Sequence, residues 1–292
     1  MNQFFYNPKF TSDNRLDILS LLDLMEVSGY DKLALNDIRY RFFSIIGAAP
    51  QLLETLRQKH AISSLDSLQW LQFLELQLSF GAPDSVIKYS REALTVTNRT
   101  RVHFLSGIAY QFKGDHESAI ASFNSGLKFL NFRQDSTFSS LYLGLLGDSY
   151  FSRGTLKEAY SCYKKSLKYN PDNHNVLNNY SYYLSINGGD LVKAERLSKR
   201  AVELQPDNAS YLDTYGWILY LLGDYSNSKR FIMEAISKGG GSDPDILEHY
   251  GDVLFKTGSV DTAIIYWEKA LKSNPSSVRL QMKIQQKSVN PN

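Results

Sequence analysis

Apolar residues recur with helical spacing in residues 244–277, which form the most regular stretch of the chain. Leu247, Tyr250 and Leu254 follow one another at steps of three and four, so they share one stripe of an α-helix. Gly258 then ends this helix, because a turn that needs a positive φ favours glycine. The stretch therefore predicts a helix with one apolar face, followed by a tight turn.

A second helix completes the same stretch. Ala263, Trp267 and Ala270 continue the helical spacing, and Ala263 is small where the two helices are expected to cross. Pro275 closes the pair, because an α-helix does not continue through proline. One such pair cannot bury its own apolar stripe, so it must stack on neighbouring pairs.

The same frame repeats along most of the chain. Its turn glycines lie 33 to 40 residues apart, at Gly81, Gly114, Gly154, Gly188, Gly223 and Gly258. The frame divides residues 67–277 into six repeats, namely 67–99, 100–133, 140–173, 174–208, 209–243 and 244–277. A fixed period in this range predicts an all-α solenoid of stacked helix pairs.

The two ends of the chain depart from this frame. Residues 278–292 predict a short capping helix and a tail, since a solenoid must cover its last apolar face. Residues 15–66 have helical spacing but fit the frame poorly, so they are either degenerate repeats or an N-terminal helical cap. Residues 1–14 are expected to be extended.

The frame resembles the tetratricopeptide repeat. That family places Trp, Leu, Gly and Tyr on the first helix of a repeat, and Ala, Phe, Ala and Pro on the second. Matching positions here include Trp70, Gly107, Tyr110, Ala119, Phe123, Gly147, Ala159 and Pro171. The resemblance implies that antiparallel helix pairs stack into a right-handed superhelix, whose first helices line a concave groove.

Composition argues against several classes of protein. The 292 residues carry 32 basic and 30 acidic side chains, a net charge of +2, and no basic stripe indicates nucleic acid as a partner. Hydrophobic residues make up 43% of the chain, which supports a sizeable core rather than disorder. No apolar run is long enough to span a bilayer. The single cysteine, Cys162, is interpreted as a buried filler.

No constellation of residues indicates catalysis or metal binding. The five histidines lack the His-Glu-x-x-His spacing of a zinc site, and no Gly-x-Ser-x-Gly elbow occurs. Residues 239–241, three glycines, lack the Lys-Ser/Thr pair that a phosphate loop requires. We therefore predict a non-enzymatic protein without a metal or cofactor.

Candidate partner-binding residues are those beside the packing stripe of the first helices, because in the tetratricopeptide family these helices line the groove. They are Asp148, Phe151, Asn178, Tyr182, Asp213, Trp217, Tyr220, Glu248, Asp252 and Phe255. Aromatics beside polar groups are typical of binding hot spots, and the carboxylates predict a protein or peptide partner with basic and apolar residues. The alternative for each aromatic is packing against the neighbouring repeat.

Two stretches near the C-terminus carry a narrower resemblance. Leu-Asp-Thr-Tyr-Gly-Trp at 212–217 and His-Tyr-Gly-Asp-Val-Leu at 249–254 resemble bacterial cell-envelope tetratricopeptide lipoproteins. Some of these act as adaptors for C-terminal processing proteases, so the resemblance implies an adaptor in the periplasm. The lipobox cysteine of such proteins is absent, and this interpretation therefore requires that a leader with its lipid anchor has been removed.

We interpret the chain as a protein–protein interaction scaffold and favour the envelope adaptor. One alternative is a cytoplasmic assembly or chaperone-like scaffold. Another is the regulatory repeat array of a larger enzyme. The residues do not identify the partner.

Overall fold

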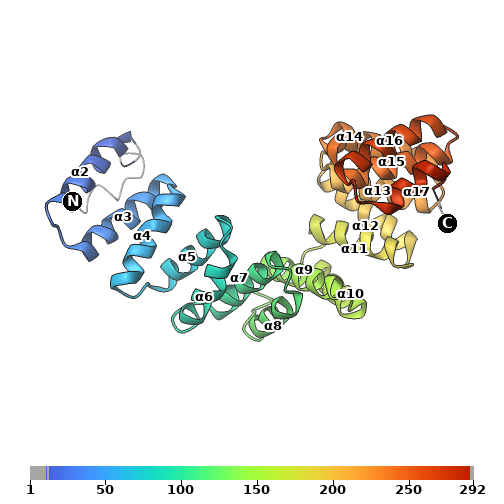
Figure 1. The fold of residues 1–292 in the computed structure, drawn as a ribbon. Coiled ribbons are helices and arrows are strands. Elements are labelled where there is room, and N and C mark those ends of the chain that lie inside the picture. Colours follow the sequence, from blue (N-terminus) through green and yellow to red (C-terminus); the bar gives the residue numbers. More distant parts are fainter. Residues whose placement is uncertain (1–10, 12, 290–292) are drawn as a thin grey trace. The chain divides into compact units, whose positions relative to one another are not determined.

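Helices make up the whole of the regular structure that is described. A computed structural model describes residue 11 and residues 13–289, in which sixteen α-helices and one short 3-10 helix occur and no β-strand (Figure 1). The prediction of an all-α fold is thus confirmed. The chain divides into two compact units. Unit 1 comprises residues 1–131 and 152–154, and unit 2 comprises residues 132–151 and 155–292.

Seven helices lie in the part of unit 1 that the structure describes from Arg15 onward. They are α2 (Arg15–Val27), α3 (Lys32–Ile46), α4 (Ala49–Ile62), α5 (Ser67–Ser79), α6 (Pro83–Ala93), α7 (Arg99–Phe112) and α8 (His116–Leu127). Within the segment 1–14 that was expected to be extended, Thr11 and Asp13 are helical. Residues 1–10 and 12 of that segment lie outside the described residues.

The remaining helices form unit 2. They are α9 (Ser136–Ser152), α10 (Leu156–Tyr169), α11 (His174–Ile186), α12 (Leu191–Leu204), α13 (Ala209–Leu221), α14 (Tyr225–Ser237), α15 (Pro244–Lys256), α16 (Val260–Ser273) and α17 (Val278–Gln286), with the 3-10 helix η2 (Gly240–Ser242) before α15. Consecutive helices contact one another as pairs, and α13 also contacts both α11 and α15. The first helices of successive repeats therefore form one continuous layer in unit 2.

Short polar side chains begin most of these helices. The side chain before the first turn accepts a hydrogen bond from the backbone N–H three residues later at Asp31, Asp66, Asn98, Asp115, Asn173, Asp190, Asn208, Asp224, Asp243 and Ser277. Each cap satisfies a donor that the helix leaves unpaired and contributes about 1 kcal/mol. The turn glycines act at the other end, and Gly223 and Gly258 both have φ of 84°, which other residues adopt only with strain.

Small residues let the two helices of a pair approach closely. A Cβ on Gly216 would lie 2.5 Å from Ile232 Cγ1, and one on Gly251 would lie 2.5 Å from Trp267 Cδ1. Ala263 at the same crossing as Gly251 is completely buried. The sequence expectation of a small residue at the helix crossing agrees with this geometry.

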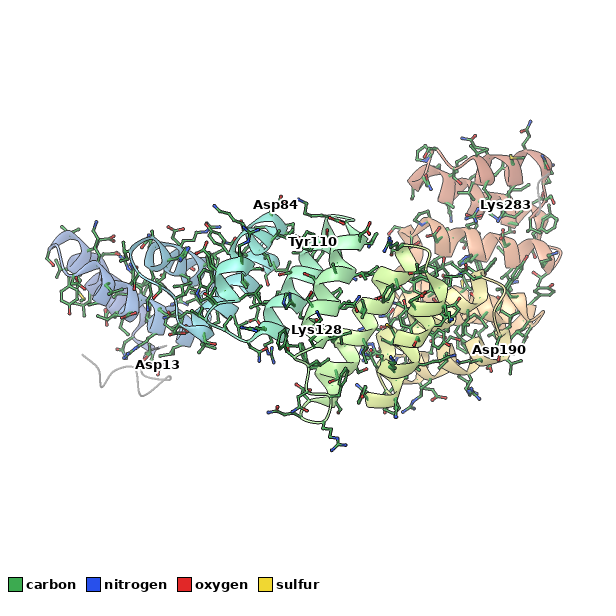
Figure 2. All side chains as sticks on the ribbon, turned by 90° about the horizontal axis from the view of Figure 1, so that it is seen from below. Asp13, Asp84, Tyr110, Lys128, Asp190 and Lys283 are labelled. Carbon is green, nitrogen blue, oxygen red and sulfur yellow. The ribbon has the colours of Figure 1, made fainter. Side chains whose placement is uncertain are left out.

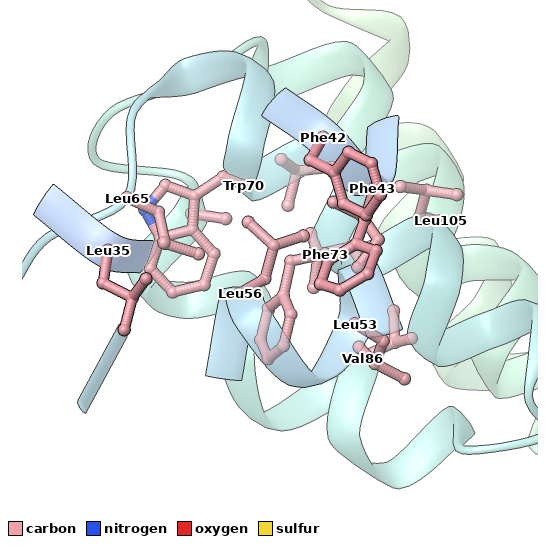
Figure 3. Close-up of a cluster of buried hydrophobic side chains, with 14 of the residues drawn as sticks. Leu35, Phe42, Phe43, Leu53, Leu56, Leu65, Trp70, Phe73, Val86 and Leu105 are labelled. Carbon is pink, nitrogen blue, oxygen red and sulfur yellow. The ribbon is translucent and has the colours of Figure 1, made fainter. Parts of the chain in front are cut away.

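Aromatic side chains fill much of the core of unit 1 (Figure 3). Phe42, Leu56, Trp70 and Phe73 are almost fully buried. The rings of Trp70 and Phe73 meet edge to face, with 6.0 Å between their centroids. Because one core contains side chains from α2 to α7, the helices of residues 15–66 pack as part of the same body as the first recognisable repeat.

Both helices of each repeat contribute to the core of unit 2. Trp267 and Tyr163 are completely buried. Cys162 is also buried, and burial raises the pKa of its thiol to about 11. The thiol therefore stays protonated near neutral pH and fills space, as the sequence predicted.

Candidate partner-binding face

All ten candidate residues lie in unit 2, on the first helices of its repeats. They are Asp148 and Phe151 on α9, Asn178 and Tyr182 on α11, Asp213, Trp217 and Tyr220 on α13, and Glu248, Asp252 and Phe255 on α15. We call this set the candidate face. The helices bring its members into one layer, but the side chains differ in what they contact.

The carboxylates of α15 are closed off by the last helix. Lys283 on α17, which Figure 2 labels, places its Nζ 2.7 Å from Glu248 Oε1 and 2.7 Å from both carboxylate oxygens of Asp252. Arg279 donates to Glu248 Oε2 at 2.7 Å, and Trp267 Nε1 donates to Asp252 Oδ1 at 2.9 Å. Burial raises the pKa of Asp252, and the Lys283 ammonium opposes that rise. Both carboxylates are therefore internal groups of the unit.

This pairing changes the expectation for the partner. Glu248 and Asp252 are only 3% and 4% exposed, so they do not offer their charge to a basic segment. The sequence reasoning missed Lys283 because it treated α17 only as an apolar cap. One signal was available: Lys283 follows Glu248 by 35 residues, about one repeat, so the two side chains occupy matching positions on successive first helices.

Three stacked rings connect α13 to α15. Trp217 lies parallel to His249, with 4.2 Å between ring centroids, and parallel to Tyr220 on its own helix at 4.9 Å. His249 Nδ1 lies 3.0 Å from both carboxylate oxygens of Asp213. Burial lowers the pKa of His249, but Asp213 and the carboxylates of α15 outweigh it, so the pKa lies above its ordinary value. The stack thus places the imidazole ring flat against an indole face, beside the Asp213 carboxylate.

The same contacts explain why the two distinctive sequence stretches occur together. Asp213 and Trp217 belong to the stretch 212–217, and His249 belongs to the stretch 249–254. Their side chains join one repeat to the next through an ion pair and a ring stack. These residues therefore have a structural role between repeats. The ring of His249 covers one face of the Trp217 indole even without a partner protein.

Three other members of the candidate face are engaged inside unit 2. Asp148 accepts hydrogen bonds from the Tyr163 hydroxyl at 2.7 Å and from Asn179 Nδ2 at 3.2 Å, and burial raises its pKa to about 6. Phe151 stacks on the ring of Tyr183 with 13° between the planes. Phe255 packs against the buried core. For these aromatics the structure agrees with the alternative of packing between repeats.

Asn178 and Tyr182 remain the least engaged, one turn apart on α11. Asn178 is 8% exposed, and its Oδ1 has no hydrogen-bond partner among the described residues. Tyr182 is half-buried, and burial is the main cause of the raised pKa of its hydroxyl. The carboxylates of Asp245 and Asp213 raise this pKa further, whereas the guanidinium of Arg279 lowers it.

Metal and membrane sites were also considered. In residues 11 and 13–289, no group of three or more His, Cys, Asp and Glu side chains could hold a metal ion. None of the helices in that part of the chain is both long and apolar enough to cross a bilayer.

Sequence comparison identifies the repeats. Two profiles, both described as tetratricopeptide repeat, match the chain, one at residues 100–129, 141–173 and 244–277 and the other at residues 162–196. The chain therefore contains tetratricopeptide repeats, and the predicted solenoid of antiparallel helix pairs is confirmed. No curated protein matches the chain in sequence.

Solved structures share this fold at low identity. The APC/C hetero-tetramer Cut9-Hcn1 aligns with a TM-score of 0.70 at 14% identity and covers 93% of this chain, which spans only 52% of the matched chain. A tetratricopeptide repeat protein from Parabacteroides merdae aligns with a TM-score of 0.61 at 12% identity, covering 88% of this chain and 98% of its own. PilW, a type IV pilus biogenesis factor, gives 0.55 at 14% identity, covering 64% and 85%. These likenesses concern the fold alone.

Proposed function

We propose that this chain is a non-enzymatic scaffold that binds an extended segment of a partner protein on the candidate face, centred on Tyr182 and Trp217. The observation that carries the proposal is the half-buried ring of Tyr182 on α11. It lies in the layer of first helices that also carries Trp217 on α13. Tetratricopeptide repeats as a class support a protein partner rather than a small substrate.

The chemistry of this face defines the segment that fits it. Asn178 Oδ1 is buried out of reach of solvent, so the partner contacts the ring of Tyr182 rather than this atom. Apolar side chains of the partner pack on the rings of Tyr182 and Trp217, which bring contact area at little entropic cost. Because Glu248, Asp252 and Asp213 are paired internally, apolar contact contributes more than charge.

The finer proposal is an adaptor of the bacterial cell envelope. Its support is the resemblance of residues 212–217 and 249–254 to envelope lipoproteins. PilW, described as a type IV pilus biogenesis factor, is an example of the same fold in another protein. Fractionation of the native organism tests this proposal, which predicts the protein in the envelope fraction; recovery in the cytoplasm would favour the cytoplasmic scaffold.

The binding site is tested by crosslinking from the face itself. A photo-crosslinking residue in place of Tyr182 should capture a defined partner from the native lysate, and the same residue in place of Phe112, an exposed aromatic of unit 1, should not. With that partner purified, Tyr182→Ala is expected to weaken binding by roughly 2 kcal/mol, about thirtyfold, as at a hot spot. Unchanged affinity in a folded Tyr182→Ala variant would place the site elsewhere.

A further inference from the structure

The second helices α10 and α12 of unit 2 carry an excess of basic side chains. Helix α10 holds four lysines and one carboxylate, and α12 holds four basic and two acidic side chains. On α10, Lys157, Lys164 and Lys168 follow one another at steps of seven and four, so they share one face of the helix. All three are exposed, as is Lys165 beside them. The balanced charge of the whole chain conceals this cluster, because carboxylates on other helices offset it.

Helix α12 extends the same surface. Asp172, in the turn after α10, pairs with Arg200 of α12 at 2.8 Å and so holds the end of α10 beside this helix. Arg196 and Lys199 lie exposed within about one turn of Arg200. We call the exposed and uncapped cations of the two helices the basic face, namely Lys157, Lys164, Lys165, Lys168, Arg196 and Lys199. The face therefore covers two helices rather than a single row.

The cations of the basic face have no carboxylate partner in the part of the chain that the structure describes. Within residues 13–289, the ion pairs of α10 and α12 involve only Arg200, which binds Asp172 and Glu203. Like charges that share one surface repel one another, and an approaching anionic surface relieves this repulsion. The basic face therefore favours a negatively charged partner.

The other side chains of these helices distinguish between anionic partners. Val192 is 72% exposed on α12, one turn before Arg196 on the same stripe. An apolar side chain among cations suits the boundary between lipid headgroups and acyl chains, but gains nothing from a phosphodiester backbone. The three rings of α10 are buried or partly buried and α12 has none, so no fully exposed ring can stack on the bases of a single strand. A lipid surface thus fits better than nucleic acid.

From these observations we propose that the basic face docks on an anionic lipid surface, with its cations at the headgroup phosphates and Val192 at the level of the headgroups. Each basic side chain near such a surface strengthens binding about fivefold. Lysine meets its partner as a point charge on a flexible stem, which suits mobile headgroups. The basic face lies on second helices and the candidate face on first helices, so either site can exist without the other.

The proposal is tested with the full chain by co-sedimentation with lipid vesicles. One set of vesicles contains phosphatidylcholine alone, and the other contains about 30% phosphatidylglycerol, an anionic lipid. The chain should sediment with the anionic vesicles at about 0.1 M salt. It should leave them at about 1 M salt, where the Debye length falls to about 3 Å. It should not sediment with phosphatidylcholine alone.

A double variant neutralises the centre of the basic face. Lys164→Gln with Lys168→Gln should weaken binding to the anionic vesicles about twenty-fivefold, from two charges at about fivefold each. Its Tm should match wild type, because both side chains are exposed and glutamine forms helices nearly as well as lysine. The matched control is Lys88→Gln with Arg91→Gln on α6 of unit 1, which removes the same charge from exposed positions. This control should change the affinity less than about twofold.

A gain of binding tests the lipid itself. Indole rings favour the membrane interface, so Val192→Trp should bind the anionic vesicles several-fold more tightly than wild type. Duplex DNA of about 20 base pairs is the second polyanion, and it should bind more weakly than the vesicles at the same salt concentration. The Val192→Trp substitution should not tighten that binding.

Several results would overturn the proposal. They are equal binding to both kinds of vesicle, no binding to the anionic vesicles, or full affinity in the folded double variant of α10. An equal loss in the α6 control would assign binding to net charge instead of the basic face. Binding to duplex DNA but not to the anionic vesicles would identify a nucleic-acid site. If the double variant of α10 fails to fold, full affinity in Arg196→Gln with Lys199→Gln decides against the proposal.

Discussion

The last helix of unit 2, α17, and the helix α2 of unit 1 meet their neighbours in different ways. In unit 2, α17 buries Leu280 and brings Lys283 to two carboxylates that would otherwise lie unpaired in the interior. In unit 1, α2 leaves Leu24 and Val27 65% and 86% exposed. It also leaves a cavity beside Asn36. The comparison shows that a helix of suitable length does not by itself close a repeat, and that complementary polar groups decide whether it does.

The ion pairs of α17 contribute mainly to specificity. Removing a lysine and two carboxylates from water costs about as much as their attraction returns, so the net stabilisation is small. If α17 packed in a different register, however, the buried charges would lack partners and the folded state would be strongly destabilised. The pairs therefore fix where α17 sits on α15.

The largest expected effect breaks this closure. Lys283→Met keeps the apolar stem but removes the ammonium, so Arg279 still pairs with Glu248 while Asp252 has no cationic partner. The substitution should lower the free energy of unfolding by about 3–5 kcal/mol. Lys59→Met is the matched change in unit 1, where the partner Asp37 is 46% exposed, and it should cost at most about 1 kcal/mol. Urea denaturation measures both. Equal losses would remove the contrast between the units.

The Lys283→Met variant should also respond to pH. Without the ammonium, burial and the neighbouring Glu248 carboxylate raise the pKa of Asp252 further above the unfolded value. A carboxyl whose folded pKa is raised is most stabilising below its unfolded pKa and loses that stability as pH rises through the folded pKa. The difference in Tm from wild type should therefore narrow at pH 4 and widen at pH 8. A constant difference would contradict this account.

The next effect tests close packing within one pair of unit 2. Gly216→Leu places a side chain where even a Cβ lies 2.5 Å from Ile232, and Ala263→Trp overfills a completely buried crossing. Each should cost about 1–3 kcal/mol, and more if the backbone must move. Gly241→Ala is the control, because its Cβ meets nothing closer than 3.6 Å. Wild-type Tm values in both large variants would show that the repeat frame is wrong.

A smaller effect concerns Asp148, whose pKa burial raises to about 6 from 3.8. Its folded pKa lies above the unfolded one, so the contribution of Asp148 to stability is greatest below pH 4 and falls as pH rises through about 6. Asp148→Asn resembles the protonated form and should stabilise unit 2 by about 1–2 kcal/mol at pH 7.5, with no gain at pH 3.5. Thermal melts at the two pH values measure this. Destabilisation at pH 7.5 would show that Tyr163 and Asn179 require the charge.

The smallest expected effect examines the open side of unit 1. Val27→Ser replaces an 86% exposed side chain and should change the free energy of unfolding by no more than about 0.5 kcal/mol. Leu280→Ala on α17 replaces a 1% exposed one and should cost about 2–5 kcal/mol. A loss above about 1 kcal/mol for Val27→Ser would mean that this face of α2 is covered in solution.

The fold could be predicted from the sequence because its signals lie within single helix pairs. The spacing of Leu247, Tyr250 and Leu254, the turn at Gly258 and the small Ala263 each depend on neighbours within one helix pair, so a single repeat reveals them. The profiles then confirm the repeats in residues 100–129, 141–196 and 244–277.

The candidate site was harder to predict, because its contacts join different repeats. A helical pattern shows that Glu248 and Asp252 share a face, but not that a lysine from the next helix covers them. Likewise, the absence of zinc-site spacing among the histidines does not reveal that His249 contacts Asp213, which lies one repeat earlier in the chain. Comparing residues at a separation of one full repeat would have revealed both pairs.

The pairing of Lys283 also determines where the array can stop. The positions that Glu248 and Asp252 occupy on α15 are held by Asp213 and Trp217 on α13, and by Asn178 and Tyr182 on α11. If the repeat of α15 and α16 were lost by deletion, α17 would bring its ammonium against an indole instead of a second carboxylate. A duplicated repeat inserted before α17 would likewise need both acids. The number of repeats ahead of this helix is therefore constrained by chemistry, and lengthening or shortening the array requires compensating substitutions.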